Sequence, residues 1–164
     1  HLQLGKVEIG GWKSKEVRQN APPEFLQDEC ERNLAFTMSQ AAMLPRLNIS
    51  SVESESLGDG LHIVRVTVEN RGFLPTNGSE LGGRLQLPPI AVKIDGADVL
   101  IGRPRIEIDH LQGRASAIIG RNRPGQSRVE NERLVEFLVR GAGEITVTVS
   151  SDRAGTAKQR VTLS

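Results

Sequence analysis

The side chains that most often carry out chemistry are few in this sequence, and most of them stand far apart. The three histidines are His1, His62 and His110, and no His-x-x-Glu or Cys-x-x-Cys pair occurs. A zinc site needs three or four ligands that converge on the metal. We therefore expect no metal site within this chain alone, and we expect His62 and His110 to be polar surface residues near strand ends.

A nucleophilic site is not indicated either. The sequence has no Gly-x-Ser-x-Gly motif, and its one cysteine is Cys30. This residue falls among apolar residues spaced as on one face of a helix, which predicts a buried structural thiol.

Three arginines fall within the short segment GRNRPGQSR, namely Arg121, Arg123 and Arg128. One interpretation is a solvated hairpin tip. The other is a contact loop for an anion or a partner protein, because guanidinium groups suit carboxylates and phosphates.

Glu8 is the remaining candidate. Val7 and Ile9 alternate with Lys6 and Glu8, and Gly10-Gly11 follows. This alternation predicts a short strand on which Glu8 faces away from its two apolar neighbours. Taken alone, a glutamate in such a position is a solvated side chain.

A helix is predicted after this strand. Pro22 and Pro23 suit a first helical turn, where a missing N–H costs nothing, and Pro45 ends the helix. A helix with an apolar stripe needs a sheet to cover, and the single strand before it cannot supply one. The stripe consists of Leu26, Cys30, Leu34, Met38, Ala41 and Ala42, and Phe25 and Phe36 are expected to widen it.

The pattern changes from period 3.6 to period 2 near residues 44–48, which predicts two domains, 1–45 and 46–164. The second is expected to be a mainly β, Ig-like or transthyretin-like antiparallel sandwich of about seven strands that folds on its own. Turn signals separate its rows, among them Gly58-Asp59-Gly60, Asn77-Gly78 and Asp95-Gly96. The alternating rows are centred on Val64–Val68, Ile90–Ile94, Ile106–Ile108, Val135–Val139, Ile145–Val149 and Val161–Leu163.

Composition and charge bear on which kinds of partner the chain has. The chain has 164 residues, a formal net charge of +1 and only 3% aromatic residues. Nothing in this charge favours nucleic acid or an anionic membrane as a partner. No apolar run approaches the roughly 20 residues that a membrane-spanning helix needs.

The first forty-five residues resemble the C-terminal end of the catalytic domain in bacterial zinc carboxypeptidases of the carboxypeptidase A type. The resemblance rests on HLQLGKVEIGGW and on NAPPEFLQDECERNLAFTMSQAAMLPRL. Members of this branch commonly have proline where Leu2 stands here. The remainder, through NRGFLPT and EFLV, resembles the β-rich tail that follows the peptidase domain.

The resemblance implies a role for Glu8. In that family a strand near the end of the catalytic domain carries the general acid/base glutamate, which takes a proton from a zinc-bound water and returns one to the leaving amine. The family's zinc ligands would all lie before His1. We therefore expect the parent to be a secreted or periplasmic zinc metallocarboxypeptidase, with zinc as its cofactor and peptides as its substrates, and this chain alone to be inactive.

Two alternatives stay open. The chain could instead be a stand-alone, non-catalytic β-sandwich that serves binding or adhesion. For the purified chain we expect a homodimer through the N-terminal helix, with fold-back of that helix onto the sandwich as the competing arrangement.

Overall fold

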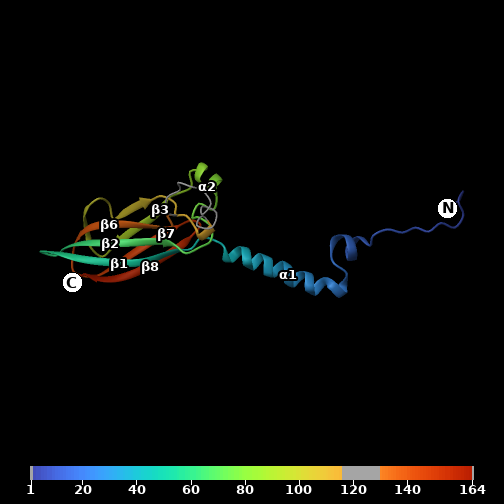
Figure 1. Ribbon diagram of the computed structural model, residues 1–164, viewed down its shortest axis with the longest axis horizontal. Helices are drawn as coiled ribbons and strands as arrows, with labels where there is room; N and C mark the ends of the chain where they lie inside the picture. Colours follow the sequence, from blue (N-terminus) through green and yellow to red (C-terminus); the bar gives the residue numbers. More distant parts are fainter. Residues whose placement is uncertain (1, 116–129, 164) are drawn as a thin grey trace, which may run out of the picture. The chain divides into compact units, whose positions relative to one another are not determined.

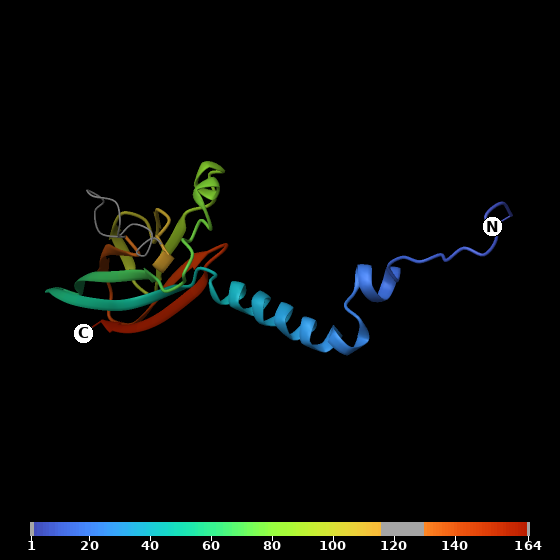
Figure 2. The ribbon, with the colours of Figure 1, turned by 45° about the vertical axis from the view of Figure 1, so that its right-hand side comes forward.

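A computed structural model describes residues 2–115 and 130–163 of the chain. The chain divides into two units, His1–Ala41 and Ala42–Ser164. Figures 1 and 2 show the strands gathered in the second unit. Each unit is considered by itself below.

The first unit has helices but no strand among its described residues. It contains a short π-helical turn, η1 (Ser14–Gln19), and the helix α1 (Pro23–Ala42). The predicted helix is therefore confirmed, and it begins at the second of the two prolines. Neither element contains a buried residue. No helix in the described part of the chain is both long and apolar enough to cross a membrane.

The strand expected around Val7–Ile9 is wrong for this structure. Residues 7–13 have no regular secondary structure and no ladder partner in the described chain. An alternating sequence supplies the two faces of a strand, but only a neighbouring strand supplies its hydrogen bonds. No such neighbour exists among the described residues of this unit.

The second unit is a sandwich of two four-stranded antiparallel sheets. The connection from β2 to β3 carries a short helix, α2 (Glu80–Arg84). The first sheet has the order β1 (Leu47–Gly58), β2 (Leu61–Asn70), β6 (Glu132–Arg140) and β4 (Asp98–Ile101). The second has the order β5 (Arg105–Ile108), β3 (Ile90–Asp95), β7 (Gly143–Ser151) and β8 (Gly155–Leu163).

The core lies between the two sheets. Along β2, β6 and β7 every second residue is buried, as the period-2 rows predicted. The largest fully buried side chain is Phe137. Burial of each large apolar side chain is worth roughly 1.5–3 kcal/mol, so this unit has the core that the first unit lacks. Its fully buried aliphatic residues are Val64, Val66, Val68, Ile90, Val92, Ile94, Leu111, Val139, Ile145, Val147 and Val149.

The predicted mainly β, antiparallel sandwich is confirmed, with eight strands among the described residues where about seven were expected. The two strands for which the sequence showed no alternating row are β1 and β4. In β1 only Leu47 and Ile49 are buried, and the strand continues through exposed polar residues to Gly58. It pairs with β2 over nearly its whole length, so its partner, not its own pattern, keeps it extended.

Candidate functional site

Glu8 is exposed and lies in the extended segment without a strand partner. A Cβ atom added at Gly10 or Gly11 would meet no atom within 4 Å. The described part of the first unit therefore holds Glu8 in no fixed environment.

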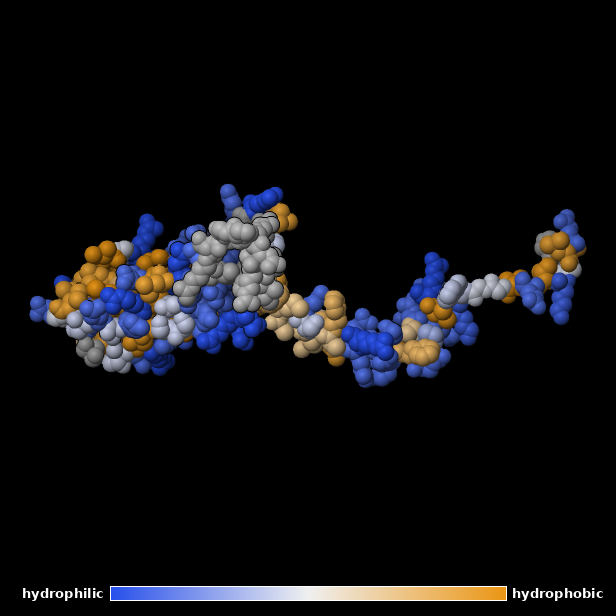
Figure 3. All heavy atoms as spheres, in the orientation of Figure 1, coloured by the Kyte–Doolittle hydropathy of each residue, from blue (hydrophilic) through white to orange (hydrophobic). Residues whose placement is uncertain are grey.

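The predicted burial of Cys30 is wrong, since its side chain is exposed. The reason is that α1 buries none of its residues. Leu26, Leu34 and Met38 of the same stripe are also exposed, at 44%, 62% and 61%. Figure 3 shows apolar side chains on the surface of α1, interrupted by hydrophilic ones.

Phe25 and Phe36 lie on one side of the stripe. A helix turns about 100° per residue, so these two side chains project within about 20° of each other. Phe36 lies about 80° around the axis from Leu26, and Leu34 lies about 80° from Leu26 in the other direction. Both phenylalanines are exposed, at 56% and 62%. The two side chains thus widen the apolar arc, as predicted, and an arc this wide is typical of an element that packs between neighbours.

The contact loop of Arg121, Arg123 and Arg128 lies outside the described residues.

The expectation that His62 is a surface residue is wrong. This side chain is only 4% exposed, at the start of β2 in line with buried Val64. Its Nδ1 atom has no hydrogen-bond partner in the described chain. The burial of His62 could have been predicted from the period-2 pattern of β2, because His62 precedes Val64 by two residues and shares its face.

Asn70 is the most highly connected polar side chain that sequence reasoning missed. It is fully buried at the end of β2. Its Oδ1 accepts hydrogen bonds from the backbone N–H groups of Arg46 (3.1 Å) and Gly72 (2.9 Å). Its Nδ2 donates to the carbonyls of Leu74 (2.9 Å) and Gln112 (3.1 Å). With all four positions used, Asn70 is a structural residue that ties the start of β1 to two loops.

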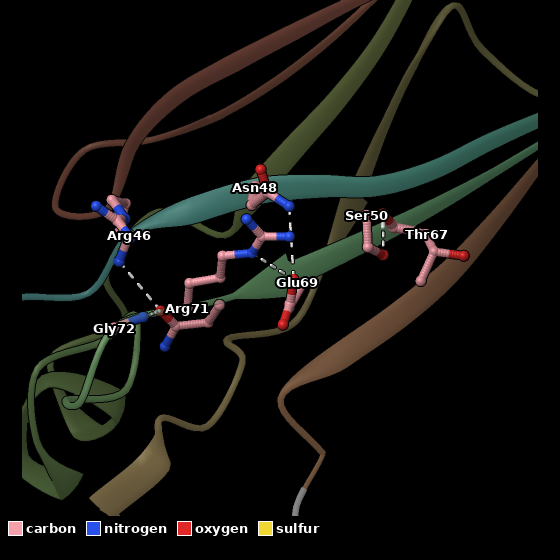
Figure 4. Close-up of polar contacts among 8 residues, drawn as sticks. Arg46, Asn48, Ser50, Thr67, Glu69, Arg71 and Gly72 are labelled. Atoms are coloured by element: carbon pink, nitrogen blue, oxygen red, sulfur yellow. Dashed lines mark hydrogen bonds and ion pairs between the residues drawn. The ribbon is translucent and has the colours of Figure 1, made fainter.

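A second polar cluster joins β1 to β2 through Glu69 (Figure 4). Glu69 accepts from Nε of Arg71 at 2.9 Å and from Nδ2 of Asn48 at 3.5 Å. These contacts use Nε of Arg71 and Nδ2 of Asn48, and they join the start of β1 to the end of β2.

Arg65 anchors a second charged group, in the middle of the first sheet. Its Nε donates to Glu136 and its Nη1 to Glu55, both at 2.8 Å. The hydrogen bond to Glu136, followed by that to Glu55, raises the pKa of Arg65 above its already high ordinary value. The guanidinium of Arg65 thus stays positively charged. The triad of Arg65, Glu136 and Glu55 links β2, β6 and β1 on an exposed face of the sheet.

A cavity of about 130 Å³ lies at the end of the sandwich where β2, β5 and β7 finish and β3 begins. His110, predicted as a polar surface residue near a strand end, lies two residues after β5, is half-buried and lines this cavity. The remaining lining residues are Thr76, Leu87, Pro88, Ser151, Asp152 and Arg153. Together with His110 they lie in or directly before three separate connections, β2 to β3, β5 to β6 and β7 to β8, so no local motif could have predicted them.

The loop of Phe73, Leu74 and Pro75 supports this end of the sandwich. All three residues are half-buried. The N–H of Leu74 donates to the carbonyl of Met43 at 2.9 Å, and the carbonyl of Phe73 accepts from Ala115 at 2.9 Å. These backbone hydrogen bonds hold the loop against the chain segments on either side of it.

Comparison with known protein families identifies this sandwich. The family described as "Domain of unknown function (DUF8731)" matches residues 46–162. The chain belongs to this family. The DUF8731 match begins one residue before β1 and ends one residue before the end of β8. It therefore covers the cavity, Asn70 and the Arg65 triad, but not Glu8 or α1.

A comparison with curated proteins finds no match. Among solved structures, a GH3 β-glucosidase of Bifidobacterium adolescentis is 18% identical over 73% of this chain and 17% of its own, with a TM-score of 0.31. DesR, a β-glucosidase from Streptomyces venezuelae in complex with D-glucose, is 13% identical over 71% and 15%, with a TM-score of 0.29. The chain spans about a sixth of the length of each. TM-scores this low support no inference about fold or function.

Proposed function

We propose that this chain is part of a zinc metallocarboxypeptidase, a hydrolase that removes C-terminal residues from peptides by proteolysis. The observation that carries the proposal is the uncovered state of α1. Its 20 residues include none that is buried, and five of its large apolar side chains are exposed over a wide arc of the helix. A helix of this kind is an element of a larger domain whose other parts cover it.

The sequence around α1 supports a proposal for the identity of that larger domain. The Val7–Gly11 and Pro22–Leu26 stretches resemble the last catalytic strand and helix of bacterial carboxypeptidases of the carboxypeptidase A type. In the proposal, neighbouring strands of the upstream catalytic domain pair with Val7–Gly11 and give Glu8 its direction. Glu8 is then the catalytic general acid/base, and it moves protons between the attacking water and the leaving amine.

The zinc that this family uses would have to be held elsewhere. Among residues 2–115 and 130–163, no group of three or more His, Cys, Asp or Glu side chains could hold a metal ion. The described residues therefore do not fit a zinc site, and the proposal assigns the ligands to the upstream catalytic domain.

The DUF8731 sandwich is, in this proposal, an accessory domain. It has its own core and its own loop network, so it can fold beside the catalytic domain and support or position it. The partners of the chain are then the upstream domain and, in the intact enzyme, the peptide substrate. The proposed location is periplasmic or secreted.

One observation favours a second candidate, a non-catalytic binding or adhesion module. The family match covers the sandwich alone, which is typical of a domain that also occurs without this N-terminal segment. The two candidates differ in whether the polypeptide upstream carries a His-x-x-Glu pair and a later histidine.

The proposal is tested on the full-length polypeptide that contains this chain. We expect it to release C-terminal residues from a peptide panel, to lose this activity with a chelator and to regain it with zinc. The isolated 164-residue chain should release nothing under either condition. Absence of zinc-dependent release from the full-length protein, or activity of the isolated chain, would contradict the proposal.

A further inference from the structure

The cavity at the loop end of the sandwich combines an oriented imidazole with two opposite charges. The imidazole belongs to His110, whose Nδ1 lies 3.3 Å from Oγ1 of Thr76. Thr76 is itself only 1% exposed, and its Oγ1 accepts from the N–H of Leu111 at 2.9 Å. A buried, hydrogen-bonded hydroxyl therefore fixes one side of the ring.

The other ring nitrogen of His110 is left for a ligand. No residue in the described part of the chain forms a hydrogen bond with its Nε2 atom. The ring lines the cavity, so Nε2 is the atom through which it can donate or accept there. An imidazole held at one nitrogen and free at the other is positioned for recognition.

The two charges come from consecutive residues of the turn between β7 and β8. Asp152 and Arg153 both line the cavity, and neither forms an ion pair within the described residues. Arg153 uses one Nη1 contact, at 3.4 Å, to the carbonyl of Asn77. Its remaining donors and the carboxylate of Asp152 are thus available, and together they add no net charge to the cavity.

The size of the cavity limits its occupant. A volume of about 130 Å³ is slightly smaller than an engineered cavity of about 150 Å³ that holds one benzene molecule. A peptide or a sugar is too large for this space, whereas a molecule of about five or six non-hydrogen atoms fits. Leu87 and Pro88 supply an apolar part of the wall, and Ser151 supplies a hydroxyl.

We propose that this cavity binds a small zwitterionic amino acid, of the size of glycine or alanine. The proposal assigns the tautomer in which Nδ1 accepts the Thr76 hydroxyl proton in preference to the Leu111 carbonyl, so that Nε2 of His110 carries the ring proton. The carboxylate of the ligand then pairs with Arg153 and accepts from Nε2–H of His110. Its ammonium group pairs with Asp152, and a methyl side chain contacts Leu87 and Pro88. The separated opposite charges of Asp152 and Arg153 match the separated charges of a zwitterion. A simple anion or a simple cation would leave one of these two side chains without a partner. This assignment does not depend on the proposed peptidase function.

The first test uses the full chain and three probes at constant ionic strength: glycine, acetate and methylammonium. Amide chemical shifts followed by NMR should show saturable glycine binding in the millimolar range, with shifts at His110, Asp152 and Arg153. Acetate and methylammonium each carry half of the charge pattern and should bind at least about tenfold more weakly. Equal binding of acetate and glycine, or no saturable shift with glycine, would overturn the proposal.

The second test uses variants. Asp152→Asn and Arg153→Gln should each weaken glycine binding about tenfold or more, because each removes one charged partner. Arg160→Gln is the matched control, since Arg160 is an exposed arginine on β8 that does not line the cavity, and it should bind as the unchanged chain does. Full glycine affinity in both cavity variants would also overturn the proposal, and thermal melts would show that each variant is folded.

Discussion

The side-chain amide of Asn70 donates to the main-chain carbonyl of Leu74 at 2.9 Å, across a turn of four residues. The same amide group also accepts from Arg46 and Gly72, so one buried side chain joins the strand β2, the loop after it and the start of β1. This arrangement shapes the end of the sandwich where the cavity lies.

Replacement of Asn70 by alanine should therefore strongly destabilise the sandwich. It would leave two buried N–H groups and two carbonyls without this partner, and the expected loss of stability is about 3 kcal/mol. Urea denaturation would measure it. Asn48→Ala is the control, because within the described residues the Asn48 side chain makes one long hydrogen bond, of 3.5 Å to Glu69. This change should cost less than about 1 kcal/mol. Similar midpoints for the two variants would contradict the role given to Asn70.

Gly72→Ala tests the close approach of two chain segments at the same end. A Cβ at this position would clash with the carbonyl oxygen of Leu44, and it would lie 2.5 Å from Cα of Pro45 and 2.8 Å from N of Arg46. Backbone atoms cannot move aside as a flexible side chain can, so we expect destabilisation by about 2 kcal/mol or more. Gly10→Ala, where the new Cβ meets nothing within 4 Å, should leave the melting temperature unchanged. An unaffected Gly72→Ala protein would show that residues 44–46 do not pack against this loop.

The sandwich should fold without the first unit. A chain that begins at Ala42 is expected to melt cooperatively, because it keeps the whole core together with the hydrogen bond from Leu74 to Met43. A chain that begins at Arg46 should also melt cooperatively but be less stable by about 1 kcal/mol or more, since it loses that acceptor and the buried Pro45. A broad, non-cooperative transition with strong dye binding in both would show that residues 1–41 are needed for the core.

The apolar arc of α1 should cause self-association of the purified chain. Leu26, Leu34 and Met38 together expose much of their surface, and burial of each is worth roughly 1.5–3 kcal/mol. Light scattering should therefore detect a dimer for the full chain and a monomer for the chain that begins at Ala42. A full chain that stays monomeric at high concentration would contradict the predicted dimer. A dimer that persists without residues 1–41 would place the contact on the sandwich.

The sequence predicted the strands that carry their own pattern. Val64 to Val68, Ile145 to Val149 and their equivalents alternate strictly, and each became a strand with one buried face. β1 escaped prediction because its outer half reads Glu-Ser-Glu-Ser, and pairing with β2 keeps it extended. The converse error occurred at Val7–Ile9, where the pattern was present but no partner strand was.

The candidate site was less predictable for a related reason. Thr76, His110 and Arg153 are separated by long stretches of sequence, and only the topology of the sandwich brings their loops together. His62 was recoverable from its spacing to Val64, whereas the exposure of Cys30 depends on what covers α1. Periodicity reports which residues share a face, but not which element packs against that face.

The central claim is that Glu8 is a catalytic acid/base in an intact metallocarboxypeptidase, and Glu8→Gln in the full-length protein tests it most directly. The amide keeps the size of the side chain but cannot exchange the proton. We therefore expect kcat to fall roughly a thousandfold while the zinc content is unchanged. Glu16→Gln is the control, because Glu16 forms only an exposed ion pair with Lys13 at 3.2 Å, and it should keep full activity. A Glu8→Gln enzyme whose kcat stays within a few-fold of the unchanged protein, with zinc bound, would contradict the claim.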